Sequence, residues 1–195
     1  MKKILTVILA LVLVLSLAAC GGSKNSPEGV VSGFCDSLKT LDAQKMQAYL
    51  KDPAEESELG LDEVPKEFMD ILKTWAKDLK YKVGKAETNG DNAKVKVDFT
   101  YTDASEIFKT ALTNYISKAM AEALSGNEVS EEKMTSILVD CIKEAQKSVK
   151  TKTADISLDF ELEKVDGNWK ISNASEELAN VMLSNMLESF GGLFD

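Results

Sequence analysis

The side chains available for chemistry in this chain are carboxylates, lysines, tyrosines and three cysteines, because the sequence contains no histidine and no arginine. Without histidine there is no Ser-His or Cys-His nucleophile pair, no imidazole metal ligand and no histidine pH switch. Without arginine there is no arginine finger and no bidentate guanidinium clamp on a phosphate or carboxylate. The sequence also lacks a glycine-rich phosphate loop, a zinc-ligand spacing and a nucleophile elbow. It therefore predicts no cofactor, no metal ion and no recognisable catalytic centre.

Cys20 is the one cysteine whose surroundings predict a specific modification. It ends a segment that begins with a basic Met-Lys-Lys and continues with an apolar run at 4–15, the pattern of a secretory signal. The segment resembles bacterial lipoprotein signals, in which the cysteine thiol receives a diacylglycerol before cleavage. The matching residues are Leu17, Ala18, Ala19 and Cys20. The resemblance implies a signal peptide at 1–19 and a lipid-anchored protein on the outer, extracytoplasmic face of the cell membrane.

An uncleaved transmembrane anchor is the alternative for this N-terminal segment. A membrane-spanning helix needs about 20 apolar residues, whereas the run from Ile4 to Ala19 is shorter and is interrupted by Ser16. Two acyl chains suffice for stable attachment, so a lipidated Cys20 needs no spanning helix. Residues 20–26 then form the lipidated cysteine and a flexible tether, whose reach of about 12–15 Å keeps the domain near the membrane.

Cys35 and Cys141 are the other two cysteines, and both fall on apolar faces of predicted helices. Outside the cytoplasm a pair of cysteines can form a disulfide. The alternative is that each is a buried small hydrophobic residue. Helical spacing predicts burial but does not give the Cα separation that a disulfide requires, so we favour two buried thiols.

The acidic balance of the chain restricts its partners. Lysines number 23 and carboxylates 32, which gives a formal net charge of −9. Nucleic acid is held largely by cationic contacts to phosphate, so no nucleic acid partner is expected. The acidic segment 52–63 could attract a cation or a basic partner. Its spacing matches no calcium loop, and we favour a solvated acidic loop.

The elements of the folded part follow from hydrophobic periodicity and turn residues. Apolar residues recur at helical spacing in three segments that begin at or near Pro27, Asp42 and Pro65. Alternating segments on either side of 89–92 and of Asp166–Gly167 predict two hairpins, because Asn-Gly and Asp-Gly favour tight turns. The hairpin strands are apolar on one face and charged on the other, so one face of the sheet should be covered by helices.

An antiparallel helical pair at 104–149 is predicted between the two hairpins, and a last helix is predicted from Ser175 through Phe190, closed by Gly191–Gly192. The pattern predicts a single α+β domain at 27–195. Its expected form is a curved antiparallel sheet of about four strands packed on helices, with the helical pair inserted and a C-terminal helix. The long apolar stripe from Ile107 to Leu124 could bind a partner or the membrane. We expect it to be buried against the second helix and the sheet.

Six aromatic residues could line a ligand pocket, but each also fits the apolar stripe of its own element, and core packing is the favoured interpretation. They are Tyr49, Tyr81, Tyr101, Tyr115, Trp75 and Trp169. Asp98 is a weak candidate for a general base, because it alternates with the apolar set and should face solvent.

A resemblance to a known fold family rests on the N-terminal helix and on a late hairpin. Ser26-Pro27-Glu28-Gly29-Val30-Val31 opens that helix, and Asp166-Gly167-Asn168-Trp169-Lys170-Ile171 forms the hairpin. These segments look like the small secreted domains of the nuclear-transport-factor-2-like superfamily. The lipoprotein signal, the helical pair and the C-terminal Gly-Gly helix resemble uncharacterised lipoproteins of low-G+C Gram-positive bacteria. The superfamily implies a cone, often with a pocket inside, which the inserted helical pair could fill or cover.

Two functions follow as hypotheses from the anchor, the cone-like pattern and the lack of a catalytic motif. The first is a non-catalytic module that binds a small apolar ligand, a peptide or another envelope protein. The alternative is an enzyme that uses Asp, Glu or Tyr acid–base chemistry inside the cone. A substrate-binding protein of a transporter is disfavoured, because the strands form hairpins instead of βαβ units.

Overall fold

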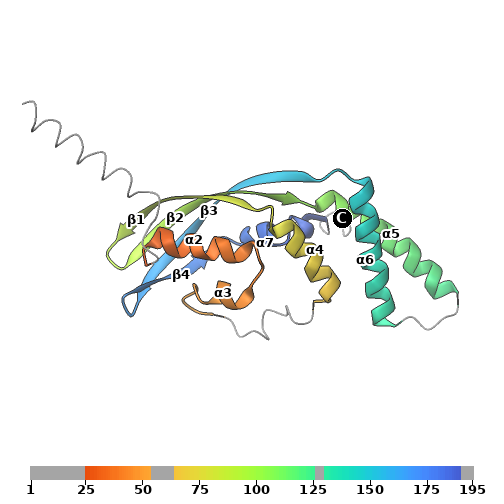
Figure 1. Cartoon of the computed structure of the whole chain (residues 1–195), viewed down its shortest axis with the longest axis horizontal. Helices are drawn as coiled ribbons and strands as arrows, with labels where there is room; N and C mark the ends of the chain where they lie inside the picture. The colour runs from red at the N-terminus through yellow and green to blue at the C-terminus, as the bar shows by residue number, and fades with distance from the viewer. Residues whose placement is uncertain (1–24, 54–63, 126–129, 190–195) are drawn as a thin grey trace, which may run out of the picture.

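The computed structural model describes residues 25–53, 64–125 and 130–189 (Figure 1). The predicted signal peptide, Cys20, most of the acidic segment 52–63 and Gly191–Gly192 lie outside the described residues. The elements follow the predicted order: α2 Pro27–Leu38, α3 Ala43–Gln47, α4 Lys66–Ala76, β1 Lys80–Asn89, β2 Asn92–Asp103, α5 Ser105–Leu124, α6 Glu131–Ser148, β3 Lys152–Val165, β4 Asn168–Ala174, α7 Leu178–Met182 and the short 3-10 helix η3 Met186–Ser189.

The sheet confirms the predicted α+β fold class. Its four strands are antiparallel in the order β1-β2-β3-β4, and each hairpin closes at a predicted turn. Gly90 has φ 61°, and Asp166 and Gly167 have φ 50° and 80°, the left-handed conformations that these tight turns require. β2 pairs with β3 along the whole length of β2. α5 and α6 are inserted in the chain between the end of β2 and the start of β3. Figure 1 shows the sheet as a long arch with α2 and α7 on one side of it.

Side-chain caps fix the starts of three helices. Ser26 accepts a hydrogen bond from the Gly29 N–H at the start of α2, where Pro27 is the first helical residue. Asp42 accepts from the Lys45 N–H and caps α3 in the same way. Ser130 accepts from the Lys133 N–H and starts α6. The predicted starts at Pro27 and Asp42 are therefore confirmed.

The buried residues form two separate clusters. The first lies between α2 and the apolar face of the sheet, with Val31 of α2 and Phe99 and Phe160 of the central strands among its fully buried members. The second lies among α4, α5 and α6, around Trp75, Ile107 and Ile142. The first cluster thus holds α2 against the sheet, and the second holds α5 and α6 against α4.

The distal half of α5 departs from the expected burial. Ile107, Phe108 and Ala111 are buried, but Met120 and Leu124 are 61% and 85% exposed. In Figure 1 the α5–α6 pair extends beyond the end of the sheet, so α6 is the neighbour along this part of α5. One neighbouring helix covers only one side of α5, and the apolar stripe is wider than that side. The predicted burial of the stripe is therefore wrong over its last two to three turns.

The predicted C-terminal helix is broken into α7 and η3. Ser184 and Asn185 lie between them with positive φ angles of 53° and 58°. The Ser184 carbonyl accepts a hydrogen bond from the Ala104 N–H (2.9 Å), and the Asn185 Oδ1 accepts from the Tyr101 hydroxyl (2.7 Å). These bonds draw the chain against the junction of β2 and α5, and a continuous helix could not make them. The break also sets where α7 lies relative to α3.

Candidate functional site

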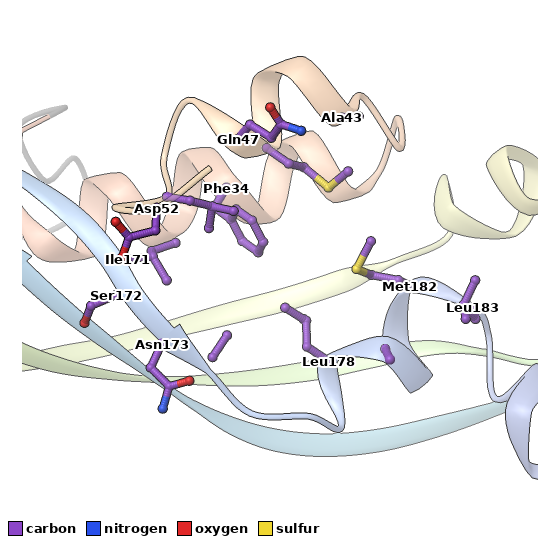
Figure 2. A pocket seen from close by; sticks show the side chains of 14 residues that line it. Phe34, Ala43, Gln47, Asp52, Ile171, Ser172, Asn173, Leu178, Met182 and Leu183 are labelled. Carbon is purple, nitrogen blue, oxygen red and sulfur yellow. The ribbon is translucent and has the colours of Figure 1, made fainter. Parts of the chain in front are cut away.

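A pocket of about 610 Å³ lies between α3 on one side and β4 and α7 on the other (Figure 2). This volume is typical of sites for small molecules. The wall is mainly apolar, with one contribution from α2. Its large apolar side chains are Phe34, Met46, Leu50, Ile171, Leu178, Met182 and Leu183. The position and the lining make it the candidate functional site.

Backbone hydrogen bonds hold α3 against the free edge of β4. The Lys51 N–H donates to the Ile171 carbonyl (2.8 Å), and the Ile171 N–H donates to the Tyr49 carbonyl (2.9 Å). The Lys170 Nζ also donates to the Ala48 carbonyl at 2.6 Å. Tyr49 lies so close to α2 that a Cβ on Gly33 would overlap its phenol ring. The end of α3 is therefore fixed to both the sheet edge and α2.

The pocket forms because α3 is short and α7 stops early. α3 has five residues, and Met46 is its buried member. α7 also has five residues and ends where the chain turns toward β2. Leu178 belongs to the first core cluster, whereas Leu183 packs against the second. The pocket therefore lies where the two clusters meet, and neither short helix fills the space between them.

Most polar groups of the lining lie toward one end of the pocket. Figure 2 shows Asp52, Ser172 and Asn173 toward one end and Met182 and Leu183 toward the other, with Gln47 on α3 between them. The Gln47 Nε2 is buried and has no hydrogen-bond partner among the described residues. Asp52 is exposed and, among the described residues of the lining, is the only one with a titratable side chain. This arrangement suits binding of an apolar body and offers a single carboxylate at the polar end.

The structure places the predicted cysteine sites as follows. Cys20 and the motif before it lie outside the described residues. Cys35 and Cys141 are both buried and both free, one in each core cluster. Burial raises the pKa of the Cys35 thiol to about 12 and also raises the pKa of Cys141. The structure thus contains two buried thiols, the favoured interpretation, and not the alternative disulfide.

None of the six aromatic residues that were candidates for a pocket lining lines this pocket. Trp75, Trp169 and Tyr101 are buried core residues, and the other three tyrosines are half-buried and pack against the clusters. The core interpretation is therefore confirmed. Burial and the neighbouring Asp36 raise the pKa of Tyr81 to about 12, and its hydroxyl donates to the Asp36 Oδ1 (2.7 Å).

Asp98 faces solvent on the open side of the sheet, as the alternation predicts. Its Oδ1 accepts a hydrogen bond from the Ser157 hydroxyl at 2.6 Å, across the β2–β3 pairing. The same face carries Lys94 and Lys96, which both pair with Asp159 at 3.0 Å. These groups therefore belong to a solvated charged surface, away from the apolar pocket.

The sequence alone did not single out the residues that form the pocket. Met46, Leu178 and Met182 have the pattern of ordinary core positions, and Gln47 and Asp52 that of surface positions. A pocket at the junction of two short helices and a strand edge depends on where these elements end in space. The closest sequence signal was the shortness of the segment after Asp42.

Comparison of the chain with protein-family models and with curated proteins finds no match. Among the described residues, no helix is long and apolar enough to cross a membrane. Within the same residues, no group of three or more Cys, Asp or Glu side chains is arranged to hold a metal ion.

Proposed function

We propose that this protein is a lipid-anchored, extracytoplasmic lipoprotein whose domain is a non-catalytic module that binds a small apolar molecule. The observation that carries the proposal is the apolar pocket between α3, β4 and α7. The lipoprotein-like signal and the short tether support the location. The resemblance to the nuclear-transport-factor-2-like superfamily, whose members often enclose a pocket, agrees with a curved sheet on helices.

The physical basis of binding is the removal of apolar surface from water. Side chains such as Phe34, Leu178 and Met182 face a space large enough for a molecule of a few hundred daltons. Two methionines in the wall add adaptability, because unbranched thioether side chains fill irregular gaps. A membrane-proximal domain of this kind could take its ligand from the lipid phase or from a neighbouring envelope component.

The enzymatic alternative needs a buried titratable group beside the bound molecule. In the lining, Asp52 is the titratable residue, and it is exposed. Tyr81 and Tyr101, whose pKa values are raised by burial, lie elsewhere and hydrogen-bond to Asp36 and Asn185. No observation in the described residues favours catalysis over binding.

The test is native mass spectrometry of the chain from Ser23 after incubation with an extract of the host's cell envelope. Both core clusters lie within residues 27–189, so this chain retains every residue of both. We expect an added mass of a few hundred daltons. Ala179→Trp, which places an indole in the pocket, should abolish it. Ala121→Trp, the same change on an exposed face of α5, should not.

Two outcomes would contradict the proposal. If no small adduct forms with the unmodified chain, the domain binds a protein partner or nothing from the envelope. If the adduct forms equally with Ala179→Trp, the ligand lies outside this pocket. Circular dichroism of both variants checks that each retains the fold.

A further inference from the structure

The charges around the pocket are distributed unevenly. Asp52 contributes a carboxylate to the polar end, and no lysine of the described part of the chain contributes to the lining. The lysines that flank this end have other partners. Lys51 Nζ pairs with the Glu163 Oε2 at 2.6 Å, and the Lys170 Nζ donates to the Ala48 carbonyl. A negatively charged ligand group would thus meet a carboxylate and no available cation.

The neutral polar groups of the lining do not select charge. The Gln47 amide carries both a donor and an acceptor, and so does the Ser172 hydroxyl. Asn173 also lines the polar end, but its side chain is exposed and donates to the Glu161 Oε2 at 3.5 Å. Among the described residues of the lining, Asp52 is therefore the one charged group that a bound molecule meets. None of the ion pairs within residues 25–53, 64–125 and 130–189 includes it.

We propose that the pocket prefers an apolar molecule with a positively charged amine end over the same molecule with a carboxylate end, and that Asp52 determines this preference. The proposal rests on the proposed function, because it concerns the ligand of the same pocket. The apolar body would lie toward Met182 and Leu183, and the amine would lie at the end that carries Asp52 (Figure 2). The overall negative charge of the chain acts in the same direction.

The expected selectivity is moderate, because Asp52 is exposed to solvent. Attraction of an amine and repulsion of a carboxylate are each screened interactions of the strength of a surface ion pair. Together they correspond to a ratio of about tenfold between the dissociation constants of the two ligands.

The experiment uses three probes with the same chain: decylamine, decanol and decanoate, each below its micelle-forming concentration. Each probe displaces the neutral fluorophore N-phenylnaphthylamine from the chain that starts at Ser23. We expect decylamine to bind most tightly, decanol next and decanoate least. Asp52→Asn should reduce the ratio between decylamine and decanoate to about twofold or less.

The matched control is Glu87→Gln, which removes one negative charge on β1, at the opposite edge of the sheet from β4. It should preserve most of the tenfold ratio. Equal binding of decylamine and decanoate would overturn the inference, and so would an unchanged ratio in Asp52→Asn. In both cases decanol binding would leave the proposed function standing. Failure of all three probes to bind would overturn the proposed function and this inference together.

Discussion

Two isoleucines on α5 provide a sharp test of the architecture, because they lie on the same helix in opposite environments. Ile107 is 1% exposed and belongs to the cluster among α4, α5 and α6, whereas Ile116 is 46% exposed on the part of α5 that extends past the sheet. The perturbation is the same in both cases, isoleucine to alanine. Both changes remove the same side-chain atoms from the same helix, so burial is the main variable.

The expected losses of stability differ severalfold. Ile107→Ala removes buried methyl and methylene groups from a packed cluster and leaves a cavity, which costs about 2–5 kcal/mol. Ile116→Ala removes a side chain that is nearly half in water, and the higher helix propensity of alanine offsets part of the loss. The net change at Ile116 should therefore stay within about 1 kcal/mol of zero.

The assay is equilibrium unfolding in urea, followed by circular dichroism and by the combined fluorescence of Trp75 and Trp169, one in each cluster. With a slope of about 2 kcal/mol per molar urea, Ile107→Ala should lower the midpoint by about 1–2.5 M. Ile116→Ala should lower it by no more than about 0.5 M. A loss above about 2 kcal/mol at Ile116 would refute the reasoning, because it would require a surface that covers the distal part of α5 in solution.

Two further predictions concern the cysteines. Burial raises the pKa of Cys35 to about 12 from an ordinary 9.0, so its neutral thiol favours the folded state. This contribution to the free energy of unfolding is complete below pH 9 and is lost as the pH rises from 9 toward 12. Unfolding midpoints measured from pH 7 to about 10.5 should fall less steeply in Cys35→Ala than in the unmodified chain, and equal slopes would contradict the raised pKa. Cys20→Ser in the full chain should abolish incorporation of labelled fatty acid and leave an uncleaved precursor. The control Cys141→Ser should incorporate the label normally. Undiminished label in Cys20→Ser would show that Cys20 is not the lipidated residue.

Much of the secondary structure could be predicted because its signals are local. Ser26 with Pro27 and the Asp166-Gly167 turn act through bonds and dihedral angles within a few residues. Period-two alternation along β2 assigns each side chain to one face of the sheet without any knowledge of its partners. Fold class followed from the order of these elements, since hairpins with one apolar face need helices to cover that face.

Where the prediction of local structure failed, a distant contact competed with a local preference. Residues 175–190 have helical periodicity, but the bonds of Ser184 to Ala104 and of Asn185 to Tyr101 break the helix. The stripe on α5 has the spacing of a buried face, but Met120 is 61% exposed, and the α5–α6 pair extends beyond the end of the sheet. The sequence pattern records which side chains are apolar, and it does not record how far the neighbouring element extends.

The sequence by itself determined the candidate anchor at Cys20, the acidic surface, the element order and the α+β class, because each depends on composition or on short-range periodicity. The tertiary structure alone decided that a pocket exists and which residues line it. That pocket depends on the fixation of α3 to Ile171 of β4 and on the early end of α7 at the junction of two clusters. Such a space is set by where elements stop relative to one another, and this is a property of contacts between residues far apart in the chain.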